Sequence, residues 1–278
     1  MKNHSILRKQ EHKRTRHKLK WNTKCKLCIG LSMIGTLIFF VIPYIRVLYY
    51  SLIDNQFRRN FVGISNYIDT LSNKYFLLAL KNSLLLIIIC VPVLILLALF
   101  ISLALAYGIK RLRATRVAFI LPMLLPTASI VLVWRMLFQN NETVLPIYLL
   151  FIWKNIGICI ILLTAAFTSI EQEMFEAASL EGTNTYQLHR YITVPLIAPT
   201  ILFTILLSIV NSFKVFKESY LYYGGNYPPE NSYTLQYYMN NNFLKLDYQA
   251  LATGAILTSL LIFIIVLGGL VLQRRYYK

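Results

Sequence analysis

Residues 83–107 read SLLLIIICVPVLILLALFISLALAY, a run of 25 residues without a charged side chain. A helix rises 1.5 Å per residue, so about 20 apolar residues cross a hydrocarbon core of roughly 30 Å. Because lipid offers the backbone no hydrogen-bond partners, such a run must be helical. Five further apolar runs of similar length lie on either side of it. The sequence therefore predicts an all-α membrane protein with six transmembrane helices, at 27–48, 83–107, 117–138, 147–169, 199–220 and 249–273.

The composition agrees with this fold class. Hydrophobic residues make up 57% of the chain and charged residues 14%, so several segments must be solvated by lipid or by one another. The basic residues indicate the topology, because cytoplasmic segments of membrane proteins carry an excess of Lys and Arg. Ten of these residues lie in 1–26, four in 108–116 and three in 274–278. We therefore expect these three segments to be cytoplasmic.

Alternation of six spans then places the remaining loops. The 170–198 loop and both termini are expected in the cytoplasm. We predict a multi-pass protein of the cell membrane, with a basic cytoplasmic tail at 1–26 and a transmembrane domain at 27–278. The loops expected outside are 49–82, 139–146 and 221–248.

The basic tail contributes much of the formal net charge of +17. We expect it to lie near anionic membrane lipid. Binding to nucleic acid is not expected, because Trp21 is the tail's lone aromatic residue and no binding module is recognisable. The apolar run that follows lacks a small-residue cleavage site, so it is expected to be a retained anchor and not a signal peptide.

Several kinds of chemistry are missing from the sequence. The histidines lie outside the predicted spans, and no P-loop sequence or row of intramembrane carboxylates occurs. Cys25 and Cys28 form one Cys-x2-Cys pair, which provides too few ligands for a zinc site. The sequence thus predicts no catalytic residue, no metal and no cofactor. If the chain transports a solute, a partner must supply the energy.

The 170–198 loop carries the most specific pattern. Glu176-Ala177-Ala178 is followed by Gly182 and, nine residues later, by Ile192-Thr193-Val194-Pro195. We expect a short helix at 171–181, and a tight or left-handed turn at Gly182, where the missing Cβ removes the steric cost. Thr183 or Asn184 is suited to cap a second short helix. Pro195 fits the first turn of the next helix, where its missing N–H costs nothing.

This spacing resembles the coupling loop of binding-protein-dependent ABC importer permeases. The resemblance implies the type I importer (MetI-like) fold and a loop that seats in a cleft of a cytoplasmic ATPase dimer. It also implies a second permease subunit, giving a heterodimer, and an extracellular solute-binding protein. Glu181, Thr183 and Val194 depart mildly from the family's usual residues. The residues that match the coupling motif are Glu176, Ala177, Ala178, Gly182, Ile192 and Pro195.

Further stretches resemble the carbohydrate-uptake branch, which includes maltose, glycerol-3-phosphate and multiple-sugar permeases. They are Trp134-Arg135, Trp153-Lys154, Phe213-Lys214-Val215-Phe216 and the segment from Tyr223 to Pro228. The resemblance implies a sugar as the solute, imported by alternating access while the partner hydrolyses ATP. The expected external loop 139–146 is shorter than is typical of this branch. Two alternatives therefore stay open: a permease for a non-sugar solute, and a transport-inactive scaffold that retains the coupling loop.

Polar side chains of the fifth predicted span are the candidates for the substrate pathway. Ser208, Asn211 and Ser212 share one helix face by their spacing and offer donors and acceptors to sugar hydroxyls. The alternative is that they join helices by interhelical hydrogen bonds. Lys214 is a fourth candidate, suited to an anionic sugar derivative, although interfacial anchoring also explains it. Glu218, four residues later, is placed to pair with Lys214.

Overall fold

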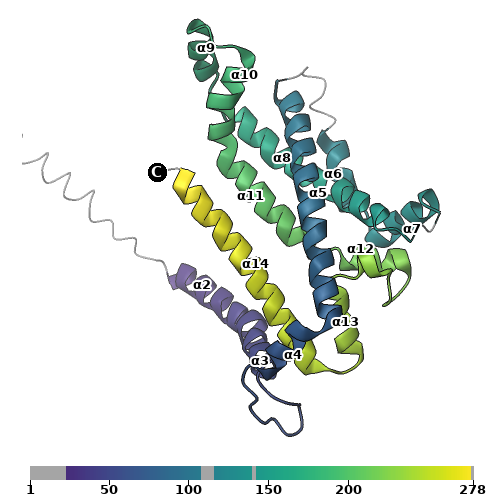
Figure 1. The fold of residues 1–278 in the computed structure, drawn as a ribbon. Coiled ribbons are helices and arrows are strands. Elements are labelled where there is room, and N and C mark those ends of the chain that lie inside the picture. Colours follow the sequence, from purple (N-terminus) through teal and green to yellow (C-terminus); the bar gives the residue numbers. More distant parts are fainter. Residues whose placement is uncertain (1–22, 108–115, 140–141, 277–278) are drawn as a thin grey trace, which may run out of the picture. The chain divides into compact units, whose positions relative to one another are not determined.

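The computed structural model describes residues 23–107, 116–139 and 142–276, and its helices are drawn in Figure 1. The chain divides into two units, Met1–Tyr49 and Tyr50–Lys278, each described by itself. Within the described residues the regular structure is helical, and the one β pairing is an isolated bridge between Ile53 and Phe61. The predicted all-α fold class is confirmed.

The first unit contains the first predicted span. Helix α2 (Thr23–Thr36) continues through the π-helical turn η1 (Leu37–Val41) into α3 (Ile42–Tyr50). In the π turn the Ile42 N–H bonds to the Leu37 carbonyl, one residue beyond the α-helical partner. Pro43 follows immediately and has no N–H to donate, so a wider turn before it accommodates the proline.

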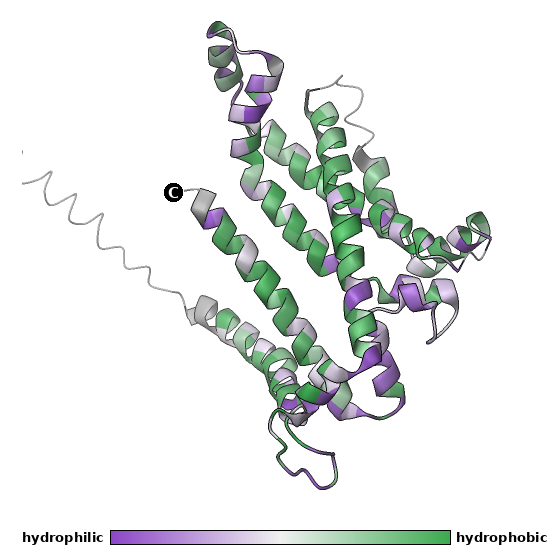
Figure 2. Ribbon diagram, viewed as in Figure 1, coloured by the Kyte–Doolittle hydropathy of each residue, from purple (hydrophilic) through white to green (hydrophobic). Residues whose placement is uncertain are grey.

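The second unit is built around two long helices. Helix α5 (Lys74–Tyr107) begins nine residues before the predicted span and packs along α8 (Leu145–Thr168). Leu94, Ile160 and Leu163 are completely buried between the helices of this unit. The Ser102 hydroxyl on α5 donates to the Ile160 carbonyl on α8 at 3.1 Å. Figure 2 shows that the long helices are hydrophobic along most of their length, with polar residues concentrated near their ends.

The third predicted span is not one straight helix. It forms α6 (Arg116–Leu124) and α7 (Thr127–Leu137), which are bent by 107° at the break. Pro126 stands at the break, where it cannot donate a backbone hydrogen bond and disfavours helical geometry at the preceding residue. The span predicted at 117–138 is therefore a pair of helices joined at a proline break. The described residues contain five helices long and apolar enough to cross a membrane, or six if this bent pair is one span.

The fifth predicted span is displaced along the chain. Helices α10 (Thr185–Leu188), η3 (His189–Thr193) and α11 (Val194–Ser212) follow one another, so the candidate span is Tyr186–Ser212 and not 199–220. After α11 the chain turns and begins the separate helix α12 (Phe216–Tyr223). The charged residues Lys214, Lys217 and Glu218 therefore lie beyond the apolar helix. The last predicted span is confirmed as the helix α14 (Tyr248–Tyr276).

Short elements close the end of the unit opposite the 170–198 loop. They are α4 (Ser65–Ser72), η4 (Glu230–Ser232) and α13 (Leu235–Leu244), and Figure 1 shows α4 and α13 near the same end of α5. The Asn82 amide on α5 donates to the carbonyls of Glu230 and Tyr233, at 2.6 and 2.9 Å. These bonds fasten the segment before α13 to the first turns of α5.

Candidate functional site

The 170–198 loop forms a helix, a turn and a second helix. Helix α9 (Gln172–Leu180) ends before Gly182, whose φ of +74° is left-handed. The Gly182 N–H bonds to the Ser179 carbonyl at 3.1 Å, and the Thr183 hydroxyl donates to the Ala178 carbonyl at 2.7 Å. These bonds satisfy carbonyls that the end of α9 leaves open. The predicted helix and the predicted turn at Gly182 agree with this geometry.

The second helix of the loop is capped by a reciprocal pair. The Gln187 N–H donates to Asn184 Oδ1 at 2.8 Å, and the Asn184 N–H donates to Gln187 Oε1 at 3.1 Å. This is the pattern of a capping box. Thr183 and Asn184 were the two residues predicted as possible caps of the second helix. Asn184 is the one that caps it, whereas the Thr183 hydroxyl bonds to a carbonyl at the end of α9. Pro195 lies in the first turn of α11, directly after the π-helical turn.

Much of the loop's surface is open in this chain. Glu176 and Ala177 are exposed, and the Gln172 amide donates to Glu176 Oε1 at 2.9 Å. Ala178 is 7% exposed, whereas Leu180 is 89% exposed. Ile192 is half-buried and Pro195 is exposed. Figure 1 shows α9 and α10 projecting from the ends of α8 and α11. The loop thus presents the Glu176 carboxylate and the apolar Leu180 side chain on one short helix.

A second feature is a polar cavity of about 250 Å³ between α6, α8, α11 and α12. Helix α8 contributes Lys154 and Asn155, α11 contributes Asn211, and the turn after α11 contributes Lys214. The cavity is lined by Met123, Phe151, Lys154, Asn155, Asn211, Lys214, Val215 and Glu218. It therefore offers amides and charged groups from segments that are far apart in the sequence.

An ion pair borders the polar cavity. Lys154 Nζ pairs with Glu218 Oε1 and also donates to Thr127 Oγ1 at 2.9 Å. The expected pairing of Glu218 with Lys214 was wrong. The two residues do not share a continuous helix, because the chain turns at Phe213–Val215 before α12 begins. The ion pair instead joins α8 to α12.

The structure divides the four candidates for the substrate pathway. Asn211 lines the polar cavity, where its amide donates to Asn155 Oδ1 at 3.2 Å, and Lys214 is exposed at the same cavity. Ser208 is 1% exposed and Ser212 7% exposed. Their hydroxyls donate to backbone carbonyls of α11, those of Thr204 and Ile209, at 2.8 and 2.6 Å. The Ser208 hydroxyl also contacts Cys159 Sγ on α8 at 3.6 Å, so the buried serines have the features of helix-packing residues.

Sequence reasoning missed the part that α8 plays in this cavity. Lys154 was named within the Trp153-Lys154 stretch as part of the family resemblance, and not as a residue that lines a cavity. Asn155 was not singled out, although it is a polar residue inside an apolar run. An amide at that position is a usable signal, since polar groups within a span usually face protein or water.

The sequence pattern of one family spans most of the second unit. The family described as "Binding-protein-dependent transport system inner membrane component" matches residues 79–277. The chain belongs to this family. The match includes the 170–198 loop, all the helices that line the polar cavity, and α13 and α14.

Named relatives and solved structures agree with this membership. The chain is 28% identical over 273 residues to the arabinooligosaccharides transport system permease protein AraP of Bacillus subtilis, covering 86% of this chain and 84% of AraP. It is 25% identical to the sn-glycerol-3-phosphate transport system permease protein UgpA of Yersinia pestis, covering 87% and 90%. A bacterial ABC transporter that imports the acidic polysaccharide alginate contains a chain with the same fold, with a TM-score of 0.73, 23% identity, and coverage of 95% of this chain and 100% of that one.

Proposed function

We propose that this chain is one of two transmembrane subunits of an ATP-driven importer that passes a sugar into the cytoplasm by alternating access. Its partners are a second, similar permease, a cytoplasmic ATPase dimer and an extracellular solute-binding protein. The chain hydrolyses nothing itself, and the ATPase supplies the energy. The chain lies in the cell membrane with both termini and the 170–198 loop in the cytoplasm.

The observation that carries this proposal is the connection between the 170–198 loop and the polar cavity. The loop joins the end of α8 to the start of the helical run that becomes α11. Those two helices bear Asn155 and Asn211, whose side chains bond to each other in the cavity. When the ATPase dimer closes and moves α9, α8 and α11 tilt, and this tilting changes access to the cavity. Glu176 and Gly182 are coupling residues in this mechanism.

A sugar as the solute is supported by the cavity's chemistry and by the relatives' names. The amides of Asn155 and Asn211 donate and accept hydrogen bonds, as sugar hydroxyls do. The Lys214 ammonium provides further donors at the same cavity. AraP and UgpA are named as permease proteins of transport systems for arabinooligosaccharides and for sn-glycerol-3-phosphate. The polar cavity is the segment of the pathway that this subunit contributes.

The test is transport by the assembled importer in vesicles. The wild type is compared with Glu176→Lys, and with Glu142→Lys as a control that makes the same charge change at the other end of α8. We expect Glu176→Lys to abolish saccharide-stimulated ATP hydrolysis and uptake while the complex still assembles, and Glu142→Lys to hydrolyse normally. If Glu176→Lys supports saccharide-stimulated ATP hydrolysis at the wild-type rate, Glu176 is not a coupling residue. If no saccharide stimulates the wild type, the solute is of another class; if no solute does, the chain is an inactive scaffold.

A further inference from the structure

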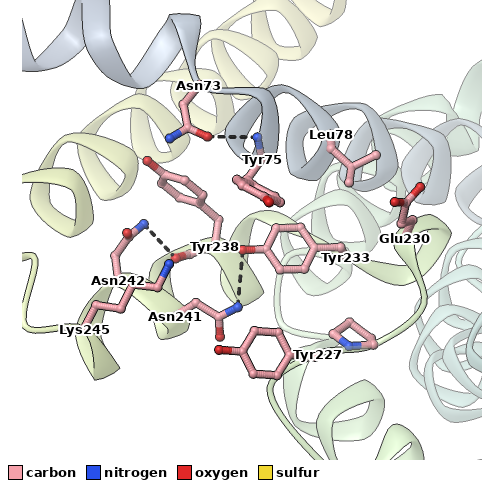
Figure 3. A pocket seen from close by; sticks show the side chains of 11 residues that line it. Asn73, Tyr75, Leu78, Tyr227, Glu230, Tyr233, Tyr238, Asn241, Asn242 and Lys245 are labelled. Carbon is pink, nitrogen blue, oxygen red and sulfur yellow. Dashed lines mark hydrogen bonds between the residues drawn. The ribbon is translucent and has the colours of Figure 1, made fainter.

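A second pocket lies at the opposite end of the unit from α9, near the start of α5. It has a volume of about 300 Å³, at the lower end of the range of small-molecule sites. Figure 3 shows side chains from the start of α5, from the segment before α13 and from α13 itself converging on it. We call it the tyrosine pocket. It is lined by Asn73, Tyr75, Leu78, Tyr227, Pro228, Glu230, Tyr233, Tyr238, Asn241, Asn242 and Lys245.

The tyrosine pocket has an exposed aromatic rim and a buried polar floor. At the rim, Tyr227 is 84% exposed and Tyr75 is 67% exposed. Exposed aromatic rings at the mouth of a pocket are open to stacking against a ligand. At the floor, Tyr238 is 3% exposed and Asn241 is 8% exposed. Tyr233 lies between these levels, and its hydroxyl accepts a hydrogen bond from the Asn241 amide at 3.4 Å.

Asn241 leaves an acceptor unused at this floor. Its Nδ2 donates to the Asn226 carbonyl at 3.2 Å and to the Tyr233 hydroxyl, but its buried Oδ1 has no hydrogen-bond partner in the structure. A buried polar atom without a partner costs roughly 1–3 kcal/mol. Figure 3 shows this amide between Tyr227 and Tyr233. A ligand that brings a hydroxyl donor to Oδ1 would remove that cost.

The walls of the pocket are held in place before any ligand arrives. The Asn240 amide donates to Asn226 Oδ1 at 3.0 Å, and Asn226 is the residue directly before Tyr227. The Asn82 amide holds the backbone of Glu230 and Tyr233, as described above. The Asn242 amide donates to the Tyr238 carbonyl at 2.9 Å. A preformed pocket spares a ligand the cost of ordering these groups.

The pocket's chemistry matches a neutral saccharide better than an ion or an apolar molecule. Burial raises the pKa of Tyr233 and of Tyr238, so both hydroxyls stay neutral at physiological pH. The two ionic residues of the lining, Glu230 and Lys245, carry opposite charges, so the lining has no net charge. A sugar ring presents an apolar C–H face that can lie on a tyrosine ring, and hydroxyls that bond to amides.

We propose that the tyrosine pocket is a second saccharide-binding site of this chain, separate from the polar cavity. The inference rests on the proposed function for its orientation: with α9 in the cytoplasm, the tyrosine pocket faces the outside. There it receives a neutral sugar unit before that unit enters the membrane. The Tyr227 ring stacks on the sugar, and Asn241 Oδ1 accepts a hydrogen bond from a sugar hydroxyl at the floor.

Binding to the whole importer complex tests this proposal, without ATP and without the solute-binding protein. The probes are neutral disaccharides, with affinity measured by calorimetry and position mapped by a photoreactive disaccharide. We expect Tyr227→Ala to weaken binding about fivefold to tenfold, which corresponds to about 1–1.4 kcal/mol. Tyr227→Phe keeps the ring and should bind nearly as the wild type does. Phe57→Ala, which removes a 96% exposed aromatic side chain outside the pocket lining, is the matched control and should bind normally.

Two measurements separate this site from the polar cavity. Photolabelling of the segment around Tyr227 should persist in Asn211→Leu, because Asn211 lines the polar cavity and is not among the residues that line the tyrosine pocket. Saccharide binding should also persist in Glu176→Lys, so a failure of coupling is distinguishable from a failure of this site. The proposal is overturned if photolabel never reaches residues of the tyrosine pocket, or if Tyr227→Ala binds as tightly as the wild type. A separate titration with the solute-binding protein gives one more outcome. If Tyr227→Ala weakens the binding of that protein and leaves disaccharide binding unchanged, the proposal is likewise overturned and the pocket is a protein-docking surface.

Discussion

A Cβ atom added to Gly157 would stand 1.9 Å from the carbonyl oxygen of Phe119. Gly157 lies on α8 and Phe119 on α6, so the two backbones approach each other too closely to leave room for a side chain at Gly157. Small residues permit such approaches in membrane proteins, where packing rather than hydrophobic burial joins helices. This contact fixes α6 against α8, and both helices line the polar cavity.

We expect Gly157→Ala to destabilise the protein because the obstacle is backbone, which no side-chain rotation removes. Overpacking usually costs about 1–3 kcal/mol, and this substitution should fall at the upper end of that range. The measurement is the thermal midpoint of the purified protein in detergent. Gly268→Ala is the control, since nothing lies within 4 Å of its added Cβ in this chain. Equal midpoints for the two variants would show that α6 shifts freely against α8.

The ion pair between Lys154 and Glu218 predicts an order of stabilities. The two side chains are 19% and 14% exposed, so either charge alone would be poorly solvated. Lys154→Met and Glu218→Gln should each destabilise the protein, because each leaves the other charge without its partner. The double variant should be more stable than either single variant. The decrease in thermal midpoint is compared among the three variants. If the decrease in the double variant equals the sum of the decreases in the two single variants, the two residues do not interact.

Substitutions of Asn211 and of Ser208 should affect transport differently. Asn211→Leu removes an amide that lines the polar cavity, so we expect uptake to require a higher saccharide concentration. Ser208→Ala removes a buried hydroxyl that donates to the carbonyl of Thr204 on its own helix and contacts Cys159 Sγ on α8 at 3.6 Å. Because Ser208 does not line the polar cavity, uptake should change little. Uptake curves in vesicles over a range of saccharide concentrations compare the two. Normal uptake by Asn211→Leu would remove the polar cavity from the pathway.

Features that depend on local spacing were predictable from the sequence. The turn at Gly182 and the cap at Asn184 follow from neighbouring residues, because glycine permits a left-handed backbone and asparagine accepts a hydrogen bond from a nearby N–H. The apolar helices follow from length and composition in the same way. The start of the fifth span was misplaced because the helix continues from the loop through polar residues such as His189 and Arg190.

Features that depend on distant pairing were not predictable. Lys154 and Glu218 are 64 residues apart, and Asn82 and Tyr233 are 151 apart. No sequence period brings such residues together, since their contact depends on how whole helices pack. The 107° bend between α6 and α7 is an intermediate case. Pro126 indicated a break, but its angle depends on what α7 packs against, which includes α12.

Gly182 offers a test of whether the coupling loop depends on backbone geometry. Its φ is +74°, and nothing lies within 4 Å of an added Cβ, so a substitution there meets backbone strain and no collision within this chain. A left-handed conformation costs most residues roughly 1–2 kcal/mol, whereas asparagine adopts it more readily. We expect Gly182→Val to lower ATP hydrolysis and uptake strongly and Gly182→Asn to retain most of both, measured in the assembled importer. If both variants transport normally, the left-handed turn is dispensable. If both variants fail equally, the loop requires a position without a side chain against the ATPase, and not the left-handed turn. Valine and asparagine differ in the cost of the left-handed backbone but are similar in size, so an equal loss points to size.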